Sequence, residues 1–208
     1  MGKRLFDIAS ALVLLLTTAP ILGVSALAIY LESGRPILFV QTRVGKDGTL
    51  FSLYKLRSLP AGDHEATART PEPTSVGRIL RRWALDELPQ LWNVLRGDMS
   101  LVGPRPILPP EARGYNARQR RRLDVKPGLT GWAQIHGRNA LPWTERVEHD
   151  LWYVEHAGFW TDLKVLVCTP LVLLRGTGVR GPGDRDPTAS EVQQRPPQEA
   201  SVDTSPEA

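Results

Sequence analysis

The feature that most constrains the fold is an apolar run close to the start of the chain. Residues 5–31 contain one charged side chain, Asp7, among aliphatic, aromatic and small polar residues. As a single helix this run would extend about 40 Å, whereas the hydrocarbon core of a bilayer is about 30 Å thick. The hydropathy therefore predicts a membrane segment, and its simplest form is a helix that crosses the bilayer once.

Two features of this segment favour a different path through the membrane. Pro20 lies near its middle, where proline removes a backbone hydrogen bond and kinks or breaks a helix. Basic side chains flank both ends, and the positive-inside rule draws them to the cytoplasm: Lys3 and Arg4 before the run, and Arg35, Arg43, Lys46, Lys55 and Arg57 after it. A re-entrant helix over residues 1–34, broken near Pro20, satisfies both features. The single-pass helix remains the alternative.

The pattern after this helix predicts an α/β domain of mostly short helices with a small β-hairpin. Residues 37–44 and 49–57 read as strands joined by the turn Gly45-Lys46-Asp47-Gly48. Glycine and proline predict loops at 60–75 and 127–139. The remaining segments predict helices over 76–83, from Asp86 as N-cap to Gly97 as stop, over 110–124 and over 143–157.

Two C-terminal segments have contrasting compositions. Residues 162–175 are apolar but too short to span a bilayer, which places them at the membrane interface or in the core. Residues 181–208 contain five prolines and no aromatic, leucine or isoleucine, so a disordered tail is expected. The predicted organisation is a membrane helix, a catalytic domain with interfacial helices over 35–180, and this tail.

The charge balance favours anionic partners. The tail has six acidic and two basic residues, so the chain's net charge of +4 leaves +8 on residues 1–180. Nucleotides, nucleic acids and acidic membrane surfaces all suit such a body. The arginines at 118 and 120–122 lack interleaved aromatics, which favours a solvated or lipid-facing helix over a nucleic-acid site. Cys168 excludes an internal disulfide and suits packing in its apolar run.

The segment Leu85-Asp86-Glu87-Leu88-Pro89 places two carboxylates side by side. They could simply cap a helix, because acidic side chains favour its positive end. The same position also attracts phosphate. An aspartate can attack phosphorus, and a neighbouring carboxylate can hold Mg²⁺ together with substrate phosphates. Asp86 and Glu87 are therefore candidate catalytic and metal-binding residues.

Several basic residues could serve such chemistry. Arg105 lies between Pro104 and Pro106, which stiffen its loop and lower the entropic cost of placing a guanidinium. Lys55 and Arg57 alternate along a strand and so share a face. Arg138 ends a glycine-rich loop beside Asn139. The plainer interpretation of each is a solvated side chain.

These motifs, taken in order, resemble the bacterial sugar transferase family of small monotopic phosphoglycosyl transferases. The resemblance extends from Lys3 to about Gly178. Its motifs are the stretches 3–7, 54–58, 85–94, 96–106 and 126–132. The resemblance implies transfer of a phospho-sugar from a UDP-sugar to undecaprenyl phosphate, with release of UMP, at the start of surface glycan synthesis.

The resemblance also implies residue roles. Asp86 would be the nucleophile and carry a phospho-sugar, while Glu87 supports Mg²⁺. The expected substrate-binding residues are Lys55, Arg57, Arg105, Pro106 and Arg138. The family's N-terminal helix is re-entrant and broken at a proline, here Pro20. The implied location is the bacterial plasma membrane, with the catalytic domain on its cytoplasmic face.

Two other functions fit the same residues. A Mg²⁺-dependent nucleotide-sugar pyrophosphohydrolase would use the acids on water. A basic membrane-anchored protein would bind acidic lipid or nucleic acid without turnover. Under the transferase hypothesis the partners are the UDP-sugar, undecaprenyl phosphate and membrane lipids, with no nucleic acid. Self-association is left open.

Overall fold

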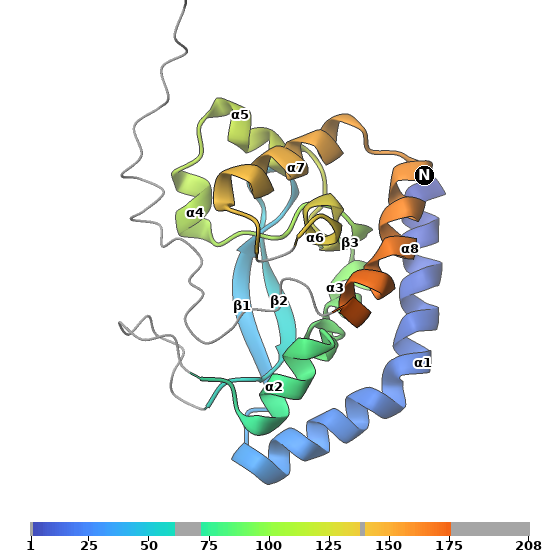
Figure 1. The fold of residues 1–208 in the computed structure, drawn as a ribbon, viewed down its shortest axis with the longest axis vertical. Coiled ribbons are helices and arrows are strands. Elements are labelled where there is room, and N and C mark those ends of the chain that lie inside the picture. Colours follow the sequence, from blue (N-terminus) through green and yellow to red (C-terminus); the bar gives the residue numbers. More distant parts are fainter. Residues whose placement is uncertain (1, 61–71, 138–139, 176–208) are drawn as a thin grey trace, which may run out of the picture.

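The computed structural model describes residues 2–60, 72–137 and 140–175. Short helices surround a two-stranded hairpin, and one long helix, α1 (Gly2–Ser33), runs along the edge of the molecule (Figure 1). Within the described part of the chain, α1 alone has the length and composition needed to cross a membrane. Its most apolar 18-residue stretch has a mean hydropathy of 2.3 and is 11% buried. The predicted mixture of short helices and a small hairpin is confirmed.

Helix α1 is bent rather than interrupted. Its helical assignment continues through Pro20, and Figure 1 shows the helix changing direction about half-way along. Pro20 supplies a physical cause, because its ring displaces the preceding turn and it donates no hydrogen bond. The break expected near Pro20 is thus a bend in a continuous helix. The re-entrant path through a membrane stays a prediction.

The first half of α1 is anchored to the body of the molecule by buried polar contacts. The Asp7 carboxylate is 3% exposed and accepts hydrogen bonds from Ser100 Oγ at 2.8 Å and the Leu101 N–H at 3.1 Å. Ala11, from the next turn, is fully buried in the main hydrophobic core. One side of this apolar helix therefore belongs to the protein interior.

The predicted hairpin is formed by β1 (Leu38–Val44) and β2 (Leu50–Leu56), which pair antiparallel. A 3₁₀ turn, η1 (Lys46–Gly48), joins them. In its register Phe39 opposes Lys55, and Val44 opposes Leu50. The strands and the turn agree with the sequence prediction.

A parallel strand pair was not predicted from the sequence. β3 (Ser100–Val102) pairs with β4 (Gly128–Thr130), and β4 and the following α6 (Trp132–Ile135) lie where a loop was expected over 127–139. The prediction failed because each strand has only three residues, too few for a periodic pattern. The close backbone approach depends on Gly103 and Gly128, where a Cβ would lie 2.1–2.3 Å from backbone atoms.

The helix before the acid pair has nearly its predicted limits, whereas the helix after the pair begins later than predicted. α2 (Ser75–Arg82) is capped by Thr74, and α3 (Gln90–Arg96) ends at Gly97 with φ 96°. Asp86 is not the N-cap of α3, contrary to prediction. It lies in a separate 3₁₀ turn, η2 (Leu85–Glu87), because Pro89 takes the capping position.

The arginine-rich segment is three short pieces rather than one helix over 110–124. These are α4 (Pro109–Arg113), α5 (Ala117–Arg120) and η3 (Arg121–Asp124). Asn116 starts α5 with a capping box, which explains the interruption. The predicted helix at 143–157 is α7 (Trp143–Glu155), and the apolar segment is α8 (Phe159–Arg175).

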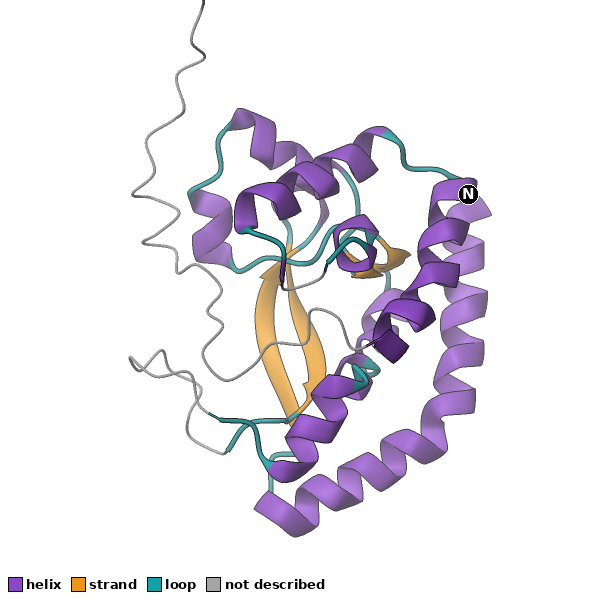
Figure 2. Cartoon of the chain, viewed as in Figure 1, coloured by secondary structure: helices purple, strands orange, loops and turns teal. Residues whose placement is uncertain are grey.

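Helix α8 lies beside the first half of α1 (Figures 1 and 2). Lys3 of α1 donates to Asp162 of α8 at 2.5 Å, and the Phe6 and Phe159 rings meet edge to face. Val165 enters the main core, whereas Leu171 and Leu174 remain exposed. The predicted tail at 181–208 lies outside the described residues.

Candidate active site

The two predicted catalytic acids lie in the tight turn between α2 and α3. Ala84 has a left-handed backbone, with φ 53°, and its carbonyl accepts the Glu87 N–H at 3.2 Å. A residue other than glycine rarely adopts this conformation, and such strain concentrates at functional sites. The turn presents Asp86 and Glu87 to one cavity.

Asp86 is buried, with 8% of its surface exposed. Burial, followed by the negative charge of Glu87, raises the pKa of the Asp86 carboxyl. The nearby positive charges of Lys55, Arg81 and Arg105 oppose that rise. A carboxylate with a raised pKa is the stronger base and nucleophile once ionised. The site thus combines a reactive carboxylate with cations that can receive phosphate.

Glu87 brings two of the predicted cations together. Its Oε1 accepts hydrogen bonds from Lys55 Nζ at 2.7 Å and from Arg105 Nη2 at 3.3 Å. Lys55 comes from β2, while Arg105 comes from the loop after β3. Asp86 and three other predicted site residues therefore meet, although they are separated by up to fifty positions in the sequence.

The loop that carries Arg105 is fixed by its backbone carbonyls. The Pro104 carbonyl accepts from the Gly128 N–H at 2.9 Å, and the Ile107 carbonyl accepts from the Val44 N–H at 2.9 Å. Between them, the Pro106 carbonyl accepts from Arg43 at 3.2 Å, and the Arg105 carbonyl lies 3.5 Å from Arg122 Nη2. The prolines alone do not hold this loop; the surrounding elements hold it too.

Arg57 has a structural role that the sequence did not reveal. Its Nη2 donates to the carbonyls of Ser33 and Gly34, both at 2.8 Å, and to Ser33 Oγ at 2.7 Å, which ties the end of α1 to the hairpin. Its Nε and Nη1 are buried without a hydrogen-bond partner among the described residues. Because Arg57 also lines the cavity that contains Asp86, a role in substrate binding remains a prediction.

The other predicted residues are placed differently. Pro106 does not line the Asp86 cavity; it lines a smaller neighbouring pocket that it shares with Arg105. Arg138 lies outside the described residues. Pro20 lies inside α1 and is exposed.

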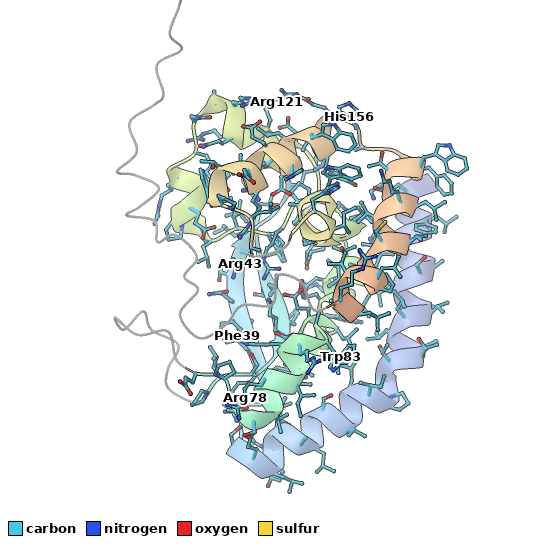
Figure 3. The ribbon with its side chains drawn as sticks, in the orientation of Figure 1. Phe39, Arg43, Arg78, Trp83, Arg121 and His156 are labelled. Carbon is cyan, nitrogen blue, oxygen red and sulfur yellow. The ribbon has the colours of Figure 1, made fainter. Side chains whose placement is uncertain are left out.

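Three further arginines line the cavity and were not predicted as site residues: Arg43, Arg81 and Arg146. Arg43 extends from β1, as labelled in Figure 3, and Arg81 donates to Ser58 Oγ at 2.7 Å. Arg81 had a sequence signal, since it lies in the last turn of a basic helix, five positions before Asp86. Arg146 had none, because only the fold brings α7 to this cavity.

The cavity itself has a volume of about 730 Å³, within the range of small-molecule sites. Gln134 also lines it, and both polar atoms of its amide are buried without a hydrogen-bond partner among the described residues. Such groups favour a ligand with complementary donors and acceptors. The cavity can therefore accept a phosphate-bearing molecule with further polar groups.

The acid pair fits a magnesium ion that is shared with a substrate. In the described ranges no group of three or more acidic, histidine or cysteine side chains could form a complete metal site. Mg²⁺ characteristically needs less than that, because it is held by one or two carboxylates together with substrate phosphates. Asp86 and Glu87, with a phosphate in the cavity, would meet this requirement.

Comparison with known proteins finds a matching family and several relatives of this chain. The family model described as bacterial sugar transferase matches residues 1–176. The chain is 44% identical over 181 residues to a Bacillus subtilis (strain 168) protein named "Uncharacterized sugar transferase EpsL", covering 86% of this chain and 90% of the relative.

Two relatives have more specific names. The UDP-glucose:undecaprenyl-phosphate glucose-1-phosphate transferase of Caulobacter vibrioides is 43% identical over 187 residues, covering 84% of this chain and 70% of the relative. The undecaprenyl-phosphate galactose phosphotransferase of Salmonella typhimurium is 39% identical over 201 residues, covering 85% of this chain but 41% of the relative. Because the family model spans all the described residues, and because the Bacillus subtilis relative is 44% identical over most of both chains, this chain belongs to the bacterial sugar transferase family.

Proposed function

We propose that this enzyme transfers a phospho-sugar from a UDP-sugar to undecaprenyl phosphate through a covalent intermediate on Asp86. The observation that carries the proposal is the setting of Asp86: a buried carboxylate in a cavity wall, beside Glu87 and faced by Lys55, Arg81 and Arg105. The names of the relatives support the donor and acceptor classes.

The first step forms the intermediate. An Asp86 carboxylate oxygen attacks the phosphorus that bears the sugar, and the bond from that phosphorus to the bridging oxygen breaks. UMP leaves with the electron pair of that bond. Burial favours this attack, because a carboxylate with a raised pKa is a stronger nucleophile than a solvated one.

The second step returns the enzyme to its starting state. A phosphate oxygen of the acceptor attacks the same phosphorus, and the bond to Asp86 breaks, which restores the carboxylate. The product is undecaprenyl-diphospho-sugar. In each step the attacking and leaving oxygens lie roughly in line, so the acceptor attacks phosphorus from the side that UMP has left, and Asp86 departs on the other.

The surrounding residues divide the remaining work. When the donor binds, Lys55 and Arg105 would exchange part of their hydrogen bonding to Glu87 for hydrogen bonds to the donor phosphates, because both side chains already point to the acid pair. Glu87 and Asp86 are the residues that would hold Mg²⁺. When bound, the ion neutralises charge on the phosphate oxygens.

The proposed location follows from the helix and its flanks. Basic residues at both ends of α1 favour a re-entrant path, with the catalytic body at the cytoplasmic face of the bacterial plasma membrane. The bend at Pro20 supports such a path, because it turns the second half of α1 away from the first. The exposed aliphatic side chains of α1 and α8 would then contact membrane lipid.

The test uses the full chain, Mg²⁺ and a panel of UDP-sugars without lipid acceptor. One equivalent of UMP should be released, and peptide mapping should find a phospho-sugar on Asp86. Asp86→Asn should fold and form no adduct. Glu87→Gln should form the adduct slowly and respond to added metal, because a Mg²⁺ ligand is weakened.

Other outcomes separate the rival functions. Continuous release of UMP without acceptor would indicate a pyrophosphohydrolase. Salt-sensitive nucleic-acid binding without turnover would indicate a binding protein. An adduct on a different residue would refute the role of Asp86.

A further inference from the structure

Five aromatic rings form one continuous stack between α6 and α7. Neighbouring ring centroids lie 4.0–5.0 Å apart, and Lys164 of α8 holds its ammonium 4.9 Å from the ring of Trp132. Ring contacts of this kind stabilise packing beyond the apolar area that they bury. The stack consists, in order, of His149, His136, Trp132, Trp152 and His156, the last of which is labelled in Figure 3.

The stack fixes the position of α6, which is only four residues long. Trp132 stacks on Trp152, and His136, one turn later, stacks on His149, so both contacts attach α6 to α7. The residues between them, Ala133, Gln134 and Ile135, line the Asp86 cavity, and α7 contributes Arg146 to the same cavity. The contact between the two helices therefore sets how two parts of the cavity wall lie relative to each other.

Two histidines of the stack are held in the same way. His136 Nδ1 lies 2.8 Å from the Trp132 carbonyl, and His156 Nδ1 lies 2.8 Å from the Trp152 carbonyl. Each imidazole also packs on the ring of the tryptophan that it contacts. A carbonyl can only accept, so we assign the proton of each neutral ring to Nδ1, which leaves Nε2 to take up a second proton. His156 is thus a matched control for His136.

The difference between them is a second imidazole. His149 covers the free face of His136, with ring centroids 5.0 Å apart and planes 17° apart. Two neutral imidazoles can remain in this contact, whereas two imidazolium ions repel each other at that distance. Protons therefore bind His136 and His149, here called the histidine pair, as coupled sites.

The acidic side chains around the histidine pair can offset one positive charge but not two. Glu148 is paired with Arg118, Asp150 with Arg122, and Glu155 with Arg121. Glu145, one turn before His149, is the exposed acid on that part of α7. Besides the pair, the ionisable side chains of the elements packed around it are Glu145, Arg146, Glu148, Asp150, Tyr153 and Glu155 of α7, Arg121, Arg122 and Asp124 of η3, and Asp162, Lys164, Cys168 and Arg175 of α8.

We propose that the histidine pair makes donor binding sensitive to acid. With at most one proton the pair holds α6 against α7 and the donor site is intact; with two protons the rings separate, the cavity wall shifts and the affinity for the UDP-sugar falls. Histidine is the side chain that ordinarily changes charge between about pH 5 and 8. His136 and His149 are then positioning residues, and the inference rests on the proposed function for the identity of the ligand.

The test measures UDP-sugar binding by calorimetry in an Asp86→Asn background, with the full chain in detergent and the UDP-sugar that gives a UMP burst with the unmodified enzyme. Under the proposed mechanism this background forms no adduct, and residue 86 no longer ionises, so the Kd reports binding alone. His136→Asn removes the pair. His156→Asn removes an imidazole with the same carbonyl contact and the same stacking on tryptophan, but leaves the pair in place.

Acidification from neutral pH to about pH 5.5 should raise the Kd with the pair intact by about fourfold more than in His136→Asn, which is the factor that repulsion between two solvated unit charges 5 Å apart supplies. At neutral pH the Kd should be the same with and without His136→Asn. His156→Asn should keep the full acid effect. If His136→Asn does not fold, His149→Gln removes the pair from the α7 side and should give the same result.

A second measurement tests the coupling itself. The chain has four histidines, so their ring signals can be followed one by one by NMR in protein with labelled histidine. His136→Asn should shift the titration of the His149 signal, and His156→Asn should leave it unchanged.

Three results would overturn the inference while leaving the proposed function intact. They are an equal acid effect with and without His136, an acid effect that His156→Asn also abolishes, and a His149 titration that does not respond to His136→Asn. Absence of a UMP burst in the unmodified enzyme with every UDP-sugar would instead reject the proposed function, and this inference with it.

Discussion

Arg122 and Asp150 form an ion pair enclosed by protein, with Nη2 and Oδ2 2.5 Å apart and side chains 4% and 0% exposed. The other terminal nitrogen of Arg122 donates to the hydroxyl of Tyr115, and burial raises the pKa of that hydroxyl to about 12. The same guanidinium lies against the Arg105 carbonyl. The pair therefore joins α7 to the loop that presents an active-site cation.

Removing one partner of this pair should destabilise the protein. Asp150→Ala leaves the Arg122 charge buried without its counterion, so we expect the free energy of unfolding to fall by about 3–5 kcal/mol. Thermal or denaturant unfolding in detergent measures this change. Glu148→Ala is the control, because its pair with Arg118 is exposed and should contribute about 1 kcal/mol or less. Equal effects in both variants would contradict the prediction.

The pH dependence of UMP release should respond in opposite directions to two substitutions. Under the proposed mechanism activity needs ionised Asp86, so it should fall as the pH drops through the raised pKa of this carboxyl. Lys55→Met removes an opposing positive charge, so the acidic limb should move to higher pH; Glu87→Gln removes a negative charge, so it should move to lower pH.

The measurement is the rate of the UMP burst as a function of pH at saturating donor and Mg²⁺. Lys46→Met is a suitable control, since Lys46 lies in the hairpin turn and its nearest carboxylate is Asp47 at 4.0 Å. If the acidic limbs of the Lys55→Met and Glu87→Gln variants shifted in the same direction, a group other than Asp86 would control the pH profile.

Asp86→Asn should make the folded protein more stable at neutral pH. The pKa of Asp86 is raised on folding, so its contribution to stability is fully present below the unfolded pKa and is lost as the pH rises through the folded value. Asparagine does not ionise, so the variant does not lose this stability as the pH rises. The Tm of the variant should exceed that of the unmodified enzyme at pH 7, and the difference should shrink as the pH is lowered. A lower Tm at pH 7 would mean that Asp86 holds the fold together.

The re-entrant path predicts that both ends of α1 face the same side of the membrane. Single cysteines at Gly2 and Leu38, in a Cys168→Ser background, should react with a membrane-impermeant maleimide only from the cytoplasmic side. Pro20→Ala should shift some molecules to a spanning form, because the cause of the bend is removed. Labelling of the two positions from opposite sides would establish a single-pass helix.

Local sequence predicted elements whose cause is local. The Gly45–Gly48 turn and its flanking strands, the stop at Gly97 and the α7 helix all follow from the chemistry of a few adjacent residues. The pairing of β3 with β4 depends on two glycines 25 positions apart that allow close backbone approach, and no local pattern contains that information. Asp86 was taken for an N-cap because the effect of Ala84 on the backbone is invisible in the sequence.

The site residues also fall into those that local sequence predicts and those that only the fold reveals. Asp86, Glu87, Lys55 and Arg105 were predicted from the chemistry of their motifs, and the fold brings them together. Arg43 and Arg146 were missed, because each is one arginine among many until β1 and α7 place it in the cavity wall. The attachment of Arg57 to the end of α1 was missed for a related reason: its partners are two backbone carbonyls, which any residue would provide, and one serine hydroxyl outside any motif.

The buried contacts of Asp7 mean that α1 cannot be treated as a detachable segment. Without residues 1–34, the Ser100 hydroxyl and the Leu101 amide would lose their acceptor, and the core around Ala11 would open to solvent. A shortened version built for solubility would consequently lose the strand that leads into the Arg105 loop, and detergent or a lipid disc around the whole chain is the route to active material.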